Sequence, residues 1–261
     1  MNDNVKKFIL ENQDLINNNE WEEVYQKTPT YLNGSFTETM LEADIHPEDY
    51  LIELPEKFLA DSTIQKFVIP KNIKKIGEGA FYHCSSLTSM IIGDNVVTIG
   101  EYAFFGCDSL TNLIIPARVT SIGRSTFRYC VNLASVIIGD SVTSIGDCAF
   151  YMCKGLTHVV IPDNVIQIGD SAFSCSNLTS IHIPRNVISI GKFAFGHCPN
   201  FSNITLPGSL TTLGENAFYG CTDLNITYEG TKEQWKNLAK DKSLGGTYTC
   251  TCVDGILKES R

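Results

Sequence analysis

A nine-residue pattern occurs seven times in the chain and constrains its fold more than any other feature. Each copy has Ile–Gly or Leu–Gly, two variable residues, then Ala–Phe (Thr–Phe in one copy) and a nearby cysteine. The glycines lie 23 residues apart, with one step of 22: Gly77, Gly100, Gly123, Gly146, Gly169, Gly191 and Gly214. A fixed period of this length predicts a solenoid, because single coils cannot bury their apolar edges whereas stacked coils share one core.

Each repeat is expected to contain two extended pieces and one turn. In residues 87–109, LTSMIIGDNVVTIGEYAFFGCDS, the first piece alternates, so Met90 and Ile92 should face one side and Ser89 and Ile91 the other. Five other repeats have proline at the position of Gly93, which ends the strand there. VVTIG predicts a second short extended piece, and AFFGC predicts a single helical turn with its phenylalanine in the core.

Seven of the ten cysteines are assigned to one inward-facing repeat position. They are Cys84, Cys107, Cys130, Cys153, Cys175, Cys198 and Cys221. An odd number cannot pair fully, and buried thiols behave as small apolar residues. The 22-residue step is attributed to FSC at 173–175, which replaces longer patterns such as FYHC. The remaining Cys148, Cys250 and Cys252 are expected to be structural, although a pairing with Cys148 stays open.

The repeated order C-x-x-L-x-x-I-x-I-P-x-x-V-x-x-I-G-x-x-A-F over residues 64–226 resembles the BspA-type leucine-rich repeat of bacteria and protozoan parasites. The segment 228–255 also resembles the end segment common in such bacterial proteins. The resemblance implies an α/β repeat fold, a right-handed leucine-rich-repeat solenoid with a parallel β-sheet on its concave face. It further implies a role in binding proteins, often in adhesion, and no enzyme activity.

Three segments are predicted along the chain. Residues 1–63 form an acidic, mainly helical N-terminal cap with one degenerate repeat, 64–226 form about seven coils, and 227–261 form a C-terminal cap. Helical caps are expected at both ends because terminal coils otherwise expose their apolar edges.

Local patterns support this division. In the degenerate repeat, Phe58 and Leu59 take the place of Ala–Phe. In the C-terminal segment, Thr231 is expected to cap a short helix that buries Trp235.

The charge distribution excludes some classes of partner. The net charge is −9, and residues 1–63 hold 14 acids and 4 bases (−10), which leaves 15 acids and 16 bases (+1) elsewhere. No basic stripe exists to bind nucleic acid. The sequence contains no run of about 18 consecutive apolar residues, so no membrane-spanning segment is predicted. The start of the sequence lacks the features of an export signal, so a cytoplasmic location is expected for the chain as given, and a secreted or cell-surface one if such a signal was removed.

One exposed position on consecutive strands is the candidate protein-binding site. Its residues are Val68, Ile91, Ile114, Ile137, Val160, His182 and Thr205. The column is apolar for five coils, whereas a solvated strand face should be polar, and contiguous exposed apolar residues mark interaction surfaces. Three alternatives stay open, namely that β-branched residues merely favour strands, that the N-terminal segment covers the column, or that a second copy does so in a homodimer.

No motif predicts catalysis, a cofactor or a metal site. His158 and His182 can approach each other on the strand face, but no third ligand lies beside them. The His46–Tyr50 stretch is acidic, yet adjacent residues rarely form an active site. The sequence therefore predicts a non-catalytic scaffold that binds a protein partner, such as a host or cell-surface protein. The alternative is a structural repeat protein that self-associates.

Overall fold

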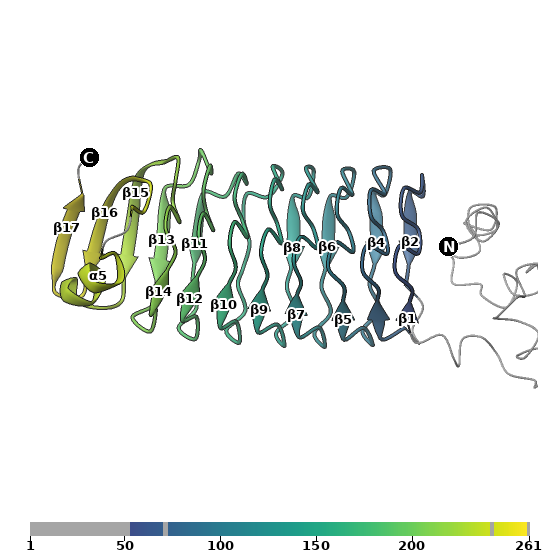
Figure 1. The fold of residues 1–261 in the computed structure, drawn as a ribbon, viewed down its shortest axis with the longest axis horizontal. Coiled ribbons are helices and arrows are strands. Elements are labelled where there is room, and N and C mark those ends of the chain that lie inside the picture. The colour runs from purple at the N-terminus through teal and green to yellow at the C-terminus, as the bar shows by residue number, and fades with distance from the viewer. Residues whose placement is uncertain (1–52, 70–72, 241–242, 260–261) are drawn as a thin grey trace, which may run out of the picture.

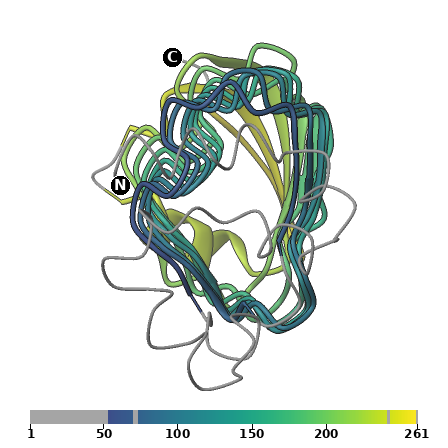
Figure 2. The same cartoon turned by 90° about the vertical axis from the view of Figure 1, so that its right-hand side faces the viewer.

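The computed structural model describes residues 53–69, 73–240 and 243–259, which form a stack of coils (Figure 1). Viewed end-on in Figure 2, the coils follow one another around a shared interior. This confirms the predicted solenoid with parallel strands. The mainly helical structure expected for the N-terminal segment falls on residues 1–52, outside the described residues.

The first extended piece of most repeats forms a short strand, and these strands make three separate sheets along one wall, which we together call the first sheet. Its parallel neighbours are β2–β4, β6–β8 and β11–β13–β15–β16, and β17 joins the last of these in the antiparallel sense. Its strands are β2 (Lys66–Val68), β4 (Ser89–Ile91), β6 (Asn112–Ile114), β8 (Ser135–Ile137), β11 (Ser180–His182), β13 (Asn203–Leu206), β15 (Cys221–Tyr228), β16 (Gly246–Cys252) and β17 (Gly255–Glu259). In β4 the central Met90 is buried and both neighbours are exposed, as the alternation predicts.

The second extended piece forms a ladder of two-residue strands along another wall. Its strands are β1 (Glu53–Leu54), β3 (Lys75–Ile76), β5 (Thr98–Ile99), β7 (Ser121–Ile122), β9 (Ser144–Ile145), β10 (Gln167–Ile168), β12 (Ser189–Ile190) and β14 (Thr212–Leu213). Neighbouring strands pair in parallel, for example Ile122 with Ile145, except that no pairing joins β5 to β7. Each of these strands buries its second residue and so contributes one aliphatic side chain to the core.

The Ala–Phe segments form a third wall, and here the predicted helical turn is wrong. Phe104 donates its backbone N–H to Thr126 of the next coil at 2.9 Å, whereas Phe105 donates within its own coil to Tyr102 at 3.0 Å. Tyr102 has a φ of 55°, which lies outside the right-handed helical region. Alternate amides therefore bond along the stack, and a helix would keep all of these bonds inside one coil.

These three walls explain why the stack is nearly straight in Figure 1. A wall of helices would separate the coils more widely than paired strands do and would curve the stack. Here the third wall also bonds coil to coil, as in Phe127 N–H to Ala149 O at 2.9 Å. The spacing is therefore similar on all sides, and the coils overlie one another in the end-on view (Figure 2).

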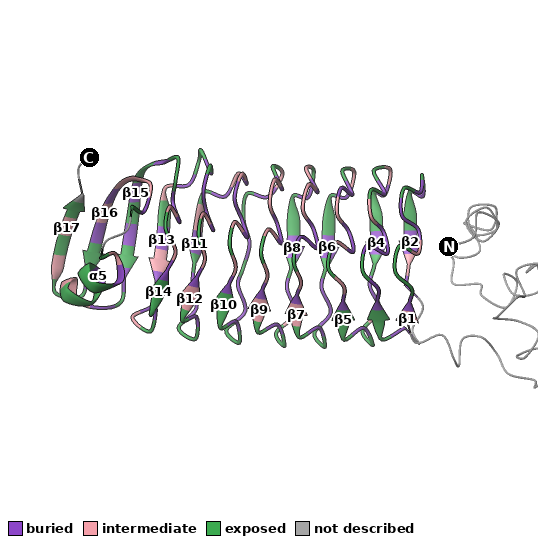
Figure 3. Ribbon diagram, viewed as in Figure 1, coloured by how far each residue is buried: buried purple, intermediate pink, exposed green. Residues whose placement is uncertain are grey.

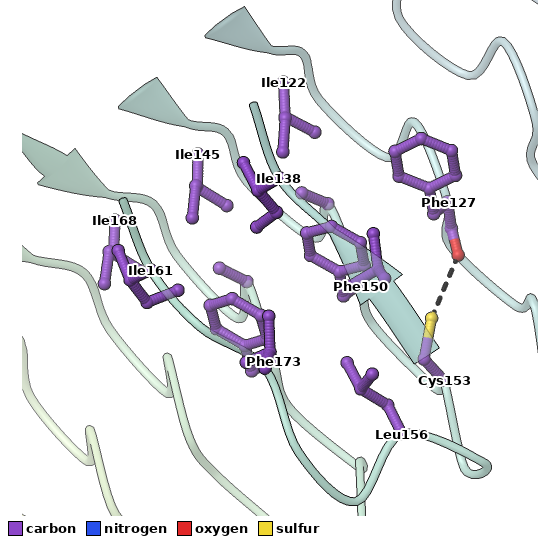
Figure 4. Packing of buried hydrophobic residues seen from close by; sticks show 14 of the residues in the cluster. Ile122, Phe127, Ile138, Ile145, Phe150, Cys153, Leu156, Ile161, Ile168 and Phe173 are labelled. Atoms are coloured by element: carbon purple, nitrogen blue, oxygen red, sulfur yellow. Dashed lines mark hydrogen bonds between the residues drawn. The ribbon is translucent and has the colours of Figure 1, made fainter. Parts of the chain in front are cut away.

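The interior is filled by a column of stacked phenylalanines (Figure 4). Phe127 lies between Phe104 and Phe150, with ring centroids 5.4 and 5.3 Å apart and rings within 15° of parallel. The column continues in both directions through the buried rings of Phe81, Phe173, Phe195 and Phe218. The repeated phenylalanine is thus a core position, as the sequence predicts.

The repeated glycine allows the coils to approach closely. A Cβ on Gly100 would lie 2.6 Å from the backbone nitrogen of Glu78, in the preceding coil. Gly123 is the exception, because the nearest atoms to its Cβ would be side-chain atoms at 3.5 Å. The glycine is therefore a steric requirement in most coils, and not a sign of a phosphate-binding loop.

The cysteine column differs from the prediction at one coil. Cys175 is only half-buried, and Ser176, which is 1% exposed, takes the inward position with its Oγ 3.3 Å from Cys198 Sγ. The missing residue therefore lies after Ser176, in the loop before Leu178. The turn wall cannot lose a residue because Cys175 N–H still bonds to Gly196 O of the next coil.

Within the described residues the two ends of the stack consist mainly of further coils and strands, so helical caps are not supported there. Among the described residues there is one helix, α5 (Lys232–Leu238), with Thr231 as its N-cap and Trp235 buried, as predicted. The rest of the C-terminal segment extends the first sheet through β16 and β17. At the other end, Leu59 is buried and donates its N–H to Ala80 O, so the degenerate repeat forms a coil of the stack.

Candidate functional site

The predicted column stands on the first sheet as a ridge of exposed apolar side chains. Ile91, Ile114, Ile137 and Val160 are 57, 61, 59 and 68% exposed. Val68 and Thr205 at the two ends are half-buried, and His182 is exposed. We call all seven residues the ridge; Figure 3 shows exposed residues along β4, β6 and β8, which carry its central part.

Strand pairing sets the alignment of the ridge. Val68 is in register with Ile91, Ile114 with Ile137, and His182 with Thr205. Val160 lies between β8 and β11, in a coil whose first extended piece is not assigned as a strand. Paired strands lie about 4.8 Å apart, so Val68 adjoins Ile91 and Ile114 adjoins Ile137, and the run of apolar residues extends over five consecutive coils.

A second row of polar residues lies beside the ridge, two residues earlier on each coil. It comprises Lys66, Ser89, Asn112, Ser135, His158, Ser180 and Asn203, of which Ser180 is half-buried and the others are exposed. We call this set the polar row. Neither set contains an aspartate or glutamate, although the chain has 29 of them. The face is therefore apolar and uncharged at its centre, with basic groups towards its ends.

The ridge changes character at His182. Beyond it, the same register continues through Thr205, Thr227 and Thr251, which are polar. His158 and His182 lie on neighbouring coils, but no group of three metal-ligating side chains exists among the described residues. The apolar part of the face thus ends within the stack and does not run to the C-terminal end.

The structure also brings together an aromatic cluster that the sequence analysis did not identify. The Arg128 guanidinium carbon lies 4.8 Å from the Tyr151 ring centroid, 5.0 Å from that of Tyr129 and 5.8 Å from that of Phe105. The signal was available, because the two residues between the core phenylalanine and the cysteine are often aromatic. These rings are half-buried against one another, so the cluster stabilises the turn wall.

The buried cysteines are poor candidates for chemistry. Cys153 Sγ donates to Phe127 O at 3.2 Å, and burial raises the pKa of its thiol well above the usual value. Burial likewise raises the pKa of Cys221 to about 12. A raised pKa disfavours the nucleophilic thiolate. None of the ten cysteines forms a disulfide, and Cys250 and Cys252 lie side by side with their sulfurs 3.7 Å apart. The structure thus forms no Cys148 pairing.

The architecture defines the class first: a solenoid repeat protein with a short parallel strand in nearly every coil. The sequence of residues 52–174 and 120–239 matches the BspA type leucine rich repeat region, with six copies. This match covers well over half of the chain, so the chain belongs to the BspA-type leucine-rich repeat family. That family supports a general role as a protein-interaction scaffold.

Two solved structures of leucine-rich repeat proteins are similar to this chain. A leucine-rich repeat protein of T. pallidum is 29% identical, with a TM-score of 0.57 over 65% of this chain and 80% of that one. A leucine-rich repeat protein from Bacteroides ovatus is 25% identical, with a TM-score of 0.46 over 70% of this chain and 66% of that one. A search of the curated proteins finds no match. Among the described residues, no helix has the length and apolar character needed to cross a membrane.

Proposed function

We propose that the chain is a non-catalytic scaffold that binds a protein partner through the ridge and the polar row. The observation that carries this proposal is the run of four consecutive coils whose outward β-branched residues are 57 to 68% exposed. Burial of such side chains is worth about 25 cal/mol per Å² of apolar surface, so leaving them in water forgoes stabilisation that a partner would recover. A partner on a host or cell surface, as in adhesion, is the finer form of the proposal.

Rigidity supports the same role. Each coil is bonded to the next along the turn wall, and paired strands add bonds on the other two walls, so the ridge residues stand on an ordered frame. A preordered surface loses little conformational entropy when it docks, so more of the contact energy appears as affinity. The neutral centre of the face also suits an apolar partner surface better than a nucleic acid or a charged small molecule.

The test compares two double variants in affinity capture from the organism that makes the chain. Ile114→Asp with Ile137→Asp places charges on the ridge. Ile166→Asp with Ile188→Asp places them beside the second ladder, where the isoleucines are 46 and 45% exposed. We expect the captured proteins, identified by mass spectrometry, to be missing with the first pair of substitutions and present with the second. When one of these proteins is purified, its direct binding should show the same difference between the two variants. Equal capture by both variants, with both folded, would overturn the proposal.

A further inference from the structure

We propose that the protein partner of the ridge is a second copy of this chain, packed face to face about a two-fold axis. This inference rests on the proposed function, because it names the occupant of the same face. It goes further by fixing the register of the contact and the strength of the association.

The shape of the stack permits such a contact. Two strongly concave faces would touch only at their ends, whereas the coils here overlie one another in the end-on view (Figure 2). Two flat sheets pack with their strands roughly aligned and about 10 Å apart, so that side chains of the two faces interdigitate. A ridge on a straight stack can therefore meet a second ridge over its whole apolar length.

A two-fold axis parallel to the strands, between β6 and β8, makes the face self-complementary. It reverses the order of the coils and keeps each row opposite the same row of the second copy. Ile114 then faces Ile137 of the second copy, and Ile91 faces Val160. In the polar row, Asn112 faces Ser135, whose hydroxyl can exchange hydrogen bonds with the amide.

The charges favour this register. Two chains with a net charge of −9 repel each other over most of their surfaces, and only a face without carboxylates allows close approach. In the proposed register Lys66 faces Ser180 of the second copy, and His158 faces Ser89. No charged or titratable side chain of either row therefore meets one of the same sign.

The contact area predicts a weak dimer. Six coils span about 24 Å, and the two rows lie about 7 Å apart along the strand. With side-chain width added, the face covers about 400 Å² per copy, so a dimer buries about 800 Å² in total. This lies below the range of standard interfaces, so we expect a dissociation constant of about 10⁻⁵ to 10⁻⁴ M.

The experiment measures molar mass by light scattering and sedimentation equilibrium from about 5 μM to about 1 mM, a range that brackets this dissociation constant. The wild-type mass is expected to rise from 28.9 kDa towards twice that value. Ile114→Asp should weaken association at least tenfold, and the matched Ile188→Asp should leave it unchanged. Added salt should tighten the dimer slightly, because it screens the repulsion between the two acidic chains.

A cross-linking measurement tests the register. Chains with Asn112→Cys are mixed with chains with Ser135→Cys. A short bis-maleimide, whose two maleimides each react with one cysteine thiol, is then added. This mixture should give more cross-linked dimer than Asn112→Cys mixed with Asn203→Cys, whose residues would lie several coils apart. The half-buried native Cys148 and Cys175 give the same background in both mixtures.

Each outcome decides between the possibilities. Loss of the dimer in Ile114→Asp alone, with the expected cross-link, supports the proposal. A monomer at every concentration overturns it and leaves the binding of another protein to the face to be judged by the capture experiment. A dimer that survives Ile114→Asp also overturns it, because association then uses another surface.

Discussion

The interior of the coils and the ridge obey different rules, although they belong to the same coils. The interior repeats nearly the same residue type at each position, and the ring of Phe127 lies 5.4 Å from that of Phe104 and 5.3 Å from that of Phe150. The ridge changes from isoleucine and valine to histidine and threonine at His182. Stacking fixes every inward side chain, because each must match the coil above and below, whereas the outward positions remain free to vary. The run of exposed apolar residues at these unconstrained positions therefore points to function.

The largest effect is expected from removing one ring of the interior column. Phe127→Ala should lower the free energy of unfolding by about 3–5 kcal/mol, because the cavity lies between two rings that cannot collapse onto it. Urea denaturation followed by circular dichroism measures this. Phe105→Ala, on the half-buried turn wall, serves as the control and should cost clearly less. Equal losses for the two would contradict the difference between wall and interior.

A smaller effect should separate two glycines at the same repeat position. Gly100→Ala should destabilise by about 1–3 kcal/mol, because its new methyl group would overlap the backbone of the preceding coil. Gly123→Ala should cost less than about 1 kcal/mol, since its methyl group meets only ordinary contacts at 3.5 Å. The two melting curves should differ accordingly. Equal destabilisation would show that the coils do not approach each other as closely at Gly100 as described.

The buried thiols predict a loss of stability in alkaline solution. Burial raises the pKa of Cys221 from its ordinary value to about 12, so the folded state holds a proton that the unfolded state releases. That contribution is complete below about pH 9 and is lost as the pH rises towards 12, by at most about 1.4 kcal/mol per pH unit. Cys221→Ala should flatten this dependence in urea titrations at pH 8 to 10.5. An unchanged slope would contradict the burial of this thiol.

The smallest effect on stability is expected on the ridge. Ile114→Thr gives an apolar ridge position the residue type found at Thr205 and should change the free energy of unfolding by less than about 0.5 kcal/mol, because the side chain is 61% exposed. Thermal denaturation measures this. A loss above about 2 kcal/mol would mean that Ile114 belongs to the core, and that the ridge is no separate surface.

Much of this architecture could be predicted from the sequence, because the period, the glycines and the phenylalanines record contacts made in every coil. The ridge could be predicted for the same reason, since alternation in a strand fixes which side chains face outward. The turn wall was misjudged because Ala–Phe with a nearby cysteine is compatible with a helical turn. Only the coil-to-coil bonds, such as that from Phe104 N–H, show otherwise.

The position of Cys175 shows a second reason for failure. A missing residue can be placed at several points of a repeat, and matching cysteine to cysteine seemed the simplest alignment. The backbone ladder decides differently, because the turn wall keeps its length and the loop before Leu178 shortens. Ser176 then takes the inward position that cysteine occupies in the other coils, because the two side chains are similar in size. Aligning the repeats by residue type alone cannot show which segment is fixed by hydrogen bonds to the neighbouring coils.

The central claim, that the repeated residues face the interior while the ridge faces solvent, is tested most directly by thiol labelling of the native protein. Iodoacetamide followed by mass spectrometry of peptides reads all ten cysteines in one experiment. The structure predicts modification of Cys148 and Cys175, with Cys107, Cys130 and Cys153 protected until urea unfolds the chain. Labelling of those three in the native state, as fast as in urea, would contradict the stacked interior.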